Sequence, residues 1–147
     1  AGSWTVVSGP SPSARGDAQM AYDSEDGYVL LFSGALAPYG LVFYSDTWSY
    51  SGGVWSNITS TAGVAPSGRY VGGLVDDTYD GYLLLFGGYN ASSEVELGDT
   101  WSFVNGAWGQ LSPATSPPAQ NSFAMAFDPL DNEAVLYTAL GSTTWTY

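Results

Sequence analysis

The chain has 147 residues, with 14 acidic side chains, only two cationic ones, no histidine and no cysteine, and its formal net charge is −12. Without cysteine it can form no disulfide, no zinc–thiolate centre and no thiol nucleophile. Arg15 and Arg69 are the only cations, so binding to nucleic acid or to an anionic membrane surface is not expected, because both depend on basic side chains.

The composition also bounds the fold. A chain of this length fits about one domain. Nineteen glycines, eight prolines, 16% aromatic residues and no apolar period of helical spacing predict an all-β protein. No apolar run is long enough to cross a bilayer, so no membrane insertion is expected. The chain begins at Ala1 without methionine, which fits a processed secreted protein or a trimmed chain.

The first expected strand, 4–7, starts with a tryptophan, alternates in polarity and leads into a proline-rich crossing at 9–13. Trp55 and Trp108 begin similar segments, at spacings of 51 (55 minus 4) and 53 (108 minus 55) residues. A unit of about fifty residues suits a four-stranded propeller blade. The expected repeats, all within one unit spanning 1–147, are 4–54, 55–107 and 108–147.

Each repeat then continues with two expected strands joined by an acidic turn. The apolar second strands are 28–32, 82–86 and 133–137, and the turns before them are 23–27, 77–81 and 128–132. The clustered carboxylates of a turn would suit a weak calcium site. The favoured interpretation is a hairpin whose Asp caps the turn and whose Gly or Asn takes a positive φ.

The third expected strand of each repeat carries a tryptophan, namely Trp48, Trp101 and Trp145. These side chains alternate along the strand with a second aromatic residue, so the two share a face. Packing between neighbouring blades is favoured, and a platform that stacks on sugars is the alternative.

Four charged residues are assigned structural roles. We expect Arg15 and Arg69 to be buried between blades, bound to carbonyls or to a carboxylate. Asp46 and Asp99 are expected to hold the turn that enters the third strand.

In combination these elements resemble kelch repeats. An arginine-containing first strand, an apolar strand ending in Gly-Gly, an Asp-Thr-Trp-Ser-Tyr third strand and a Gly-x-Trp fourth strand recur over the whole chain, in a form similar to secreted prokaryotic or archaeal proteins. The third copy departs from the pattern, with Gln120 for the arginine and Thr138-Ala139 for Gly-Gly. The resemblance implies a β-propeller with three four-stranded blades per chain, the N-terminal strand completing the last blade of the same or a neighbouring chain.

The loop 35–45 is unusually apolar for an exposed connection. Either it extends the sheet as a longer hairpin or it docks onto a partner. The candidate interface residues are Trp4, Leu36, Tyr39, Leu41, Val42, Phe43, Tyr44, Trp145 and Tyr147. Asn57 and Asn90 fit the N-glycosylation pattern and fall in expected loops.

Catalytic residue types are scarce. Without histidine, lysine or cysteine, no catalytic site, metal centre or cofactor is expected. Because three blades are too few to close a ring, the leading hypothesis is a non-catalytic extracellular or cell-surface protein. It would self-associate into a six-bladed ring of two chains or into a filament. The alternative is a module that binds glycans or surface proteins, and the third is a carboxylate-dependent glycoside hydrolase.

Overall fold

The structure, a computed structural model, describes residues 2–36, 42–139 and 141–147. The all-β prediction is confirmed: within these ranges the regular elements are thirteen strands, paired antiparallel in four sheets. No helix in this part of the chain has the length and apolar character needed to span a membrane.

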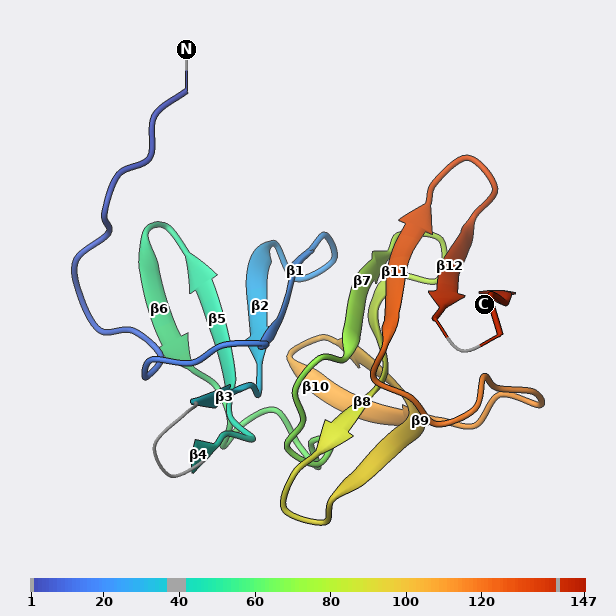
Figure 1. The fold of residues 1–147 in the computed structure, drawn as a ribbon. Helices are drawn as coiled ribbons and strands as arrows, with labels where there is room; N and C mark the ends of the chain where they lie inside the picture. The colour runs from blue at the N-terminus through green and yellow to red at the C-terminus, as the bar shows by residue number, and fades with distance from the viewer. Residues whose placement is uncertain (1, 37–41, 140) are drawn as a thin grey trace.

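Three sheets follow one another along the chain (Figure 1). The first sheet has the order β1-β2-β5-β6, with β1 (Gln19–Asp23), β2 (Tyr28–Phe32), β5 (Thr47–Ser51) and β6 (Val54–Asn57). The second sheet has the order β7-β8-β9-β10, with β7 (Gly73–Asp77), β8 (Tyr82–Asn90), β9 (Val95–Val104) and β10 (Ala107–Leu111). The third sheet has the order β11-β12-β13, with β11 (Phe123–Asp128), β12 (Glu133–Thr138) and β13 (Thr144–Thr146).

The segments between the second and third strands differ between the first two sheets. In the first, β3 (Ala35–Leu36) and β4 (Val42–Phe43) form a separate two-stranded hairpin. In the second, most of the segment 89–98 continues β8 and β9, with Tyr89 opposite Glu96. The ladder resumes here after a bulge between Phe86 and Gly88.

The N-terminal strand expected at 4–7 is not formed. Among the described residues this segment has no ladder partner, and Trp4 and Val6 are fully exposed. Figure 1 shows it running away from the sheets, on the side opposite β13. The third sheet therefore has three strands, and the N-terminal segment does not complete it within the same chain.

The second sheet lies between the other two, because β7 adjoins both β1 and β11. We call the face of a sheet that points toward the next sheet in the chain its back, and the opposite face its front. The back of the first sheet therefore faces the front of the second, and the back of the second faces the front of the third. Gly73 allows β7 to lie close to β11, because a Cβ at this position would lie 2.7 Å from the Phe123 ring and 2.8 Å from the Met125 sulfur. All three sheets are thus stacked in the same sense, front onto back.

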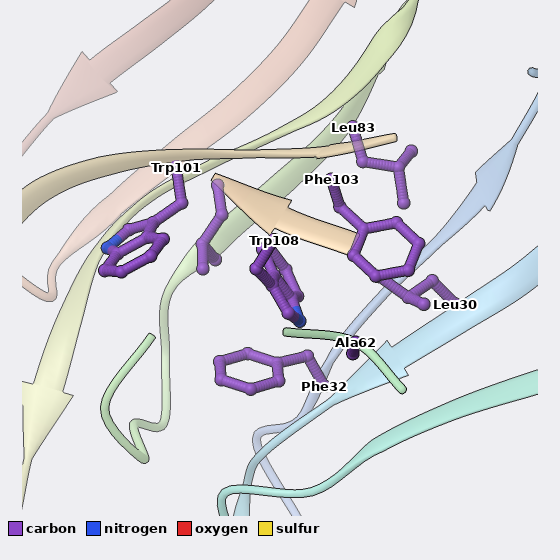
Figure 2. Packing of buried hydrophobic residues seen from close by; sticks show 8 residues of the cluster. Leu30, Phe32, Ala62, Leu83, Trp101, Phe103 and Trp108 are labelled. Atoms are coloured by element: carbon purple, nitrogen blue, oxygen red, sulfur yellow. The ribbon is translucent and has the colours of Figure 1, made fainter. Parts of the chain in front are cut away.

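The larger core fills the space between the first and second sheets (Figure 2). Its buried members are Leu30, Phe32, Ala62, Leu83, Leu85, Trp101, Phe103 and Trp108. The Trp108 ring is tilted against Phe32 and Phe103, with centroids 4.9 and 5.0 Å away. Its indole N–H donates to the hydroxyl of Thr47 at 3.1 Å, so the centre of this core carries one polar contact across the sheets.

Candidate interaction surfaces

The acidic turns have the geometry of capped hairpins. In the first, Asp23 Oδ1 accepts hydrogen bonds from the backbone N–H groups of Glu25 and Asp26. Asp77 and Asp128 repeat this arrangement in the other two hairpins. The residues that close the turns have positive φ, and they are Gly27, Gly81 and Asn132. In the described part of the chain, no group of three or more acidic side chains is placed to hold a metal ion.

Burial changes the acidity of two of these caps. Asp23 and Asp77 are almost inaccessible to solvent. Burial raises the pKa of both carboxyls, and neighbouring carboxylates add to the effect, while the turn N–H groups oppose it. Ionisation of either carboxyl therefore costs more in the folded than in the unfolded chain.

We expect Asp77→Asn to raise the free energy of unfolding at pH 7. The amide keeps an oxygen for the turn N–H groups and removes the cost of a buried charge. Because the folded pKa is raised, this cost vanishes as the pH falls through that pKa toward the unfolded value. Urea titrations between pH 7 and 4 should show the advantage of the variant shrinking, with exposed Asp131→Asn as control. A variant less stable at pH 7 would contradict the assignment.

Each cation forms a forked ion pair. Arg69 is buried, and its guanidinium binds both carboxylate oxygens of Asp99, at 2.7 and 2.8 Å, and the Gly87 carbonyl at 3.0 Å. Arg15 binds Asp46 in the same way and reaches the carbonyl of Ser33. These contacts join the crossing segment before each sheet to the aspartate that lies two residues before the tryptophan of that sheet's third strand.

Two opposing influences set the acidity of the paired carboxyls. Burial disfavours ionisation of Asp46 and Asp99, but the hydrogen bonds and charges of the arginines outweigh it. The pKa of both carboxyls therefore lies below its usual range. The indole N–H groups of Trp48 and Trp101 also donate to these carboxylates, at 2.7 and 2.6 Å.

The third sheet replaces this ion pair with neutral residues. Gln120 stands where the arginine stands in the other copies, and Thr143 stands where the aspartate does. Gln120 is buried, and its Nε2 finds no hydrogen-bond acceptor among the described atoms. A small pocket borders Gln120, Thr143 and Trp145, so this joint is packed less completely than its two counterparts.

The apolar segment 35–45 divides between packing and exposure. Phe43 stacks on Tyr70 at 6.3 Å, and the Tyr44 ring lies 3.8 Å from the guanidinium carbon of Arg15. Leu36 and Val42 remain exposed. Two further interface candidates, Tyr39 and Leu41, lie outside the described residues.

Both candidate glycosylation sites were expected in loops, but each of them is the last residue of a strand. Asn57 is the last residue of β6, and its amide oxygen accepts from the Thr59 N–H. Asn90 ends β8 and caps the following turn through the N–H groups of Ser92 and Ser93.

The front face of the first sheet is an apolar surface that no sheet in the described part of the chain covers. Strand register places large apolar side chains from all four strands on this face. They are Met20, Tyr22, Val29, Leu31, Trp48, Tyr50 and Trp55. Met20 and Tyr22 are more than half exposed. At the equivalent position in the second sheet, Phe103, which corresponds to Tyr50, is fully buried.

The back face of the third sheet is likewise not covered by any described strand. Register places Ala124, Ala126, Val135, Tyr137, Thr144 and Thr146 on it. Tyr137 is 51% exposed, whereas its counterparts Phe32 and Phe86 are buried. At its hairpin end the back face also carries Asp128 and Glu133, which the register places beside Ala126 and Val135. Asp23, which corresponds to Asp128 in the first sheet, is fully buried. Bringing the two faces together would therefore place these two carboxylates at one edge of the contact, while the rest of the contact is apolar or neutral.

The two faces were only partly anticipated from the sequence. Trp145 and Tyr147, expected to lie at an interface, belong to the front face of the third sheet, where Trp145 is half-buried. Met20, Tyr22 and Tyr137 were not anticipated. The sequence shows that these residues alternate with residues of the opposite face of the sheet. It does not show which of the two faces another sheet covers.

Comparison with known proteins adds no relative. A scan against protein-family models gives no match to this chain, and a search of curated proteins gives none either.

Proposed function

We propose that this protein is a non-catalytic structural protein of the extracellular space or cell surface, which self-associates head to tail. The front face of the first sheet of one copy packs on the back face of the third sheet of the next. In this proposal the sheets are kelch-like propeller blades. Two chains would supply six blades, within the range of closed rings, and a rotation that does not close would give a filament.

The observation that carries the proposal is the equivalence of the two uncovered faces with faces already paired inside the chain. Leu74, Leu83 and Leu85 of the second sheet pack against Leu30 and Phe32 of the first. Their counterparts on the uncovered front face are Met20, Val29 and Leu31, and on the uncovered back face Val135 and Tyr137. The uncovered faces are thus complementary to each other in the way the internal faces are.

One polar contact extends the equivalence. The Trp108 indole N–H donates to the Thr47 hydroxyl between the first and second sheets. Trp55 corresponds to Trp108 and Thr144 to Thr47, and they lie on the two uncovered faces. Head-to-tail packing would give the Trp55 N–H an acceptor in the neighbouring copy.

We expect Met20→Asp and Tyr137→Asp each to weaken self-association by about 100-fold or more, because each buries an unpaired charge at the contact. Both side chains are more than half exposed in the single chain, so folding should be retained. Met20→Leu, the residue type of the equivalent Leu74, and Tyr137→Phe are the matched controls. Light scattering after size exclusion gives the masses.

Mixing the two aspartate variants tests the head-to-tail geometry. Each variant keeps one intact face, so an equimolar mixture should form a dimer of about 31 kDa, twice 15.4 kDa, and nothing larger. A wild-type chain that stays monomeric at every concentration would refute the proposal. If that monomer bound glycans instead, the uncovered aromatic face would belong to a carbohydrate-binding module.

A further inference from the structure

The second and third sheets enclose a pocket that the other described residues do not fill. It opens to solvent, and the space free of protein atoms is about 450 Å³ when the solvent at its mouth is included. Six of its lining residues are Leu84, Phe86, Ala134, Leu136, Trp145 and Tyr147. In the repeat these correspond, in the same order, to Leu30, Phe32, Leu83, Leu85, Trp101 and Phe103 of the larger core. The pocket therefore repeats the larger core between the second and third sheets, but no described residue takes the place of Trp108.

The missing member is the equivalent of Trp108. Trp108 comes from β10, the fourth strand of the second sheet, and the third sheet has three strands within the described chain. Thr100, which corresponds to the hydrogen-bond acceptor Thr47, lines the pocket. The wall formed by Ala62 in the core is supplied here by Thr115 and its neighbours. The pocket thus combines apolar walls with hydroxyl groups that could accept from an indole N–H, Thr100 being the one that corresponds to Thr47.

We infer that Trp4 of a second copy fills this pocket, its segment 3–7 adding to β13 as a fourth strand. This rests on the proposed head-to-tail association, which brings the N-terminal part of one copy to the third sheet of the next. Trp4 is the tryptophan that precedes Trp55 and Trp108 in the repeat, and it is fully exposed. By analogy with β10 and β9, Trp4 pairs with Tyr147 and Thr5 with Thr146.

The connection from this segment to β1 has the same length as the connection from β10 to β11. Residues 8–18 link this segment to β1, and residues 112–122 link β10 to β11, eleven residues in each case. The internal connection spans one sheet to the next, so 8–18 can do the same between copies. Figure 1 shows the N-terminal segment and β13 on opposite sides of the chain, which favours donation between copies over closure within one.

The test uses disulfides, which are unambiguous in a chain that has no cysteine of its own. Thr5→Cys and Thr146→Cys chains, purified separately, are mixed and oxidised. We expect a cross-linked species of about 31 kDa, twice 15.4 kDa, on a non-reducing gel of the mixture, and not of either chain oxidised alone. Ser8→Cys replaces Thr5→Cys as the control: three residues further along a strand is about 10 Å, beyond the reach of a disulfide.

A second measurement tests the side chain itself. We expect Trp4→Ala to weaken self-association by about 30-fold or more, as for a buried interface tryptophan. Ser8→Ala should leave it unchanged. Because Trp4 makes no contact with its own chain's core, folding is not at risk.

The outcomes separate this inference from the proposed function. If the wild type associates and Met20→Asp prevents it, but the cysteine chains do not cross-link, the strand donation is wrong and the face-to-face contact stands. Cross-linking only within a Thr5→Cys/Thr146→Cys double variant would mean that the segment closes on its own chain, and would also overturn the inference. A wild-type monomer at every concentration would remove both.

Discussion

Replacing Asp99 with asparagine is expected to lower the free energy of unfolding at pH 7 by about 3 kcal/mol or more. The guanidinium of Arg69 is 0% exposed, and Asp99 is the carboxylate that neutralises it through two hydrogen bonds. An amide of the same shape leaves the guanidinium buried without a counter-charge. The carbonyls of Gly87 and Ser67 continue to accept from it, but they carry no net charge.

The effect of Asp99→Asn should depend on pH in a defined direction. The folded pKa of Asp99 lies below the unfolded value, so its ionised form stabilises the fold at neutral pH. That stabilisation is present above the unfolded pKa, near 4, and is lost as the pH falls through the folded pKa. The difference between wild type and variant should therefore narrow below about pH 4.

Urea titrations of dilute protein at pH 7 and pH 3 measure this effect. Asp131→Asn, at an exposed carboxylate, is the matched control and should change stability by no more than about 0.5 kcal/mol. A loss for Asp99→Asn no larger than that of the control, or one that is the same at both pH values, would show that the ion pair does not hold the joint.

Much of the strand pattern could be predicted because local chemistry determines it. The apolar runs 28–32, 82–86 and 133–137 are too short for helices and are followed or preceded by turn residues, and the structure has strands over all three. Asp at the start of each hairpin and Gly or Asn at its end supply a cap and a positive φ. These are requirements of a tight turn, and they act within a few residues of sequence.

Other elements depend on contacts that a repeat pattern does not contain. The two-residue strands β3 and β4 are too short to produce an alternation. The extension of β8 through Asn90 follows the bulge between Phe86 and Gly88. A Cβ on Gly88 would meet the Tyr70 carbonyl oxygen at 3.0 Å. Nothing in the polar segment 89–98 signals that its backbone continues the ladder.

The environment of equivalent residues was also beyond sequence reasoning. Trp48 and Trp101 share the same local sequence, Asp-Thr-Trp-Ser, and the same bond to an aspartate. Trp101 is nevertheless buried against the first sheet, while Trp48 lies on a face that no sheet covers. The difference comes from the order of the sheets in space, and this order creates the two candidate interaction surfaces.

Substitution of Trp108 by alanine is expected to lower the free energy of unfolding by about 3–5 kcal/mol, through lost burial and the cavity left behind. Trp108 is 6% exposed, contacts Phe32 and Phe103, and donates its indole N–H to Thr47. Trp55 occupies the equivalent position on the uncovered front face. There it packs on Tyr50, with ring centroids 4.9 Å apart, and stays half-buried. In dilute, dissociated protein, Trp55→Ala should therefore cost much less.

Concentration separates the two tryptophans. If the uncovered faces pack together, association stabilises the folded chain by mass action, and Trp55 becomes as buried as Trp108. The loss of unfolding free energy caused by Trp55→Ala should then rise with protein concentration toward the loss caused by Trp108→Ala. Most of the loss for Trp108→Ala should already be present in the dissociated chain, because Trp108 is buried there. Urea unfolding followed by circular dichroism over a hundredfold range of concentration measures both. A cost of Trp55→Ala that is small and constant over this range would mean that the front face of the first sheet stays open to solvent.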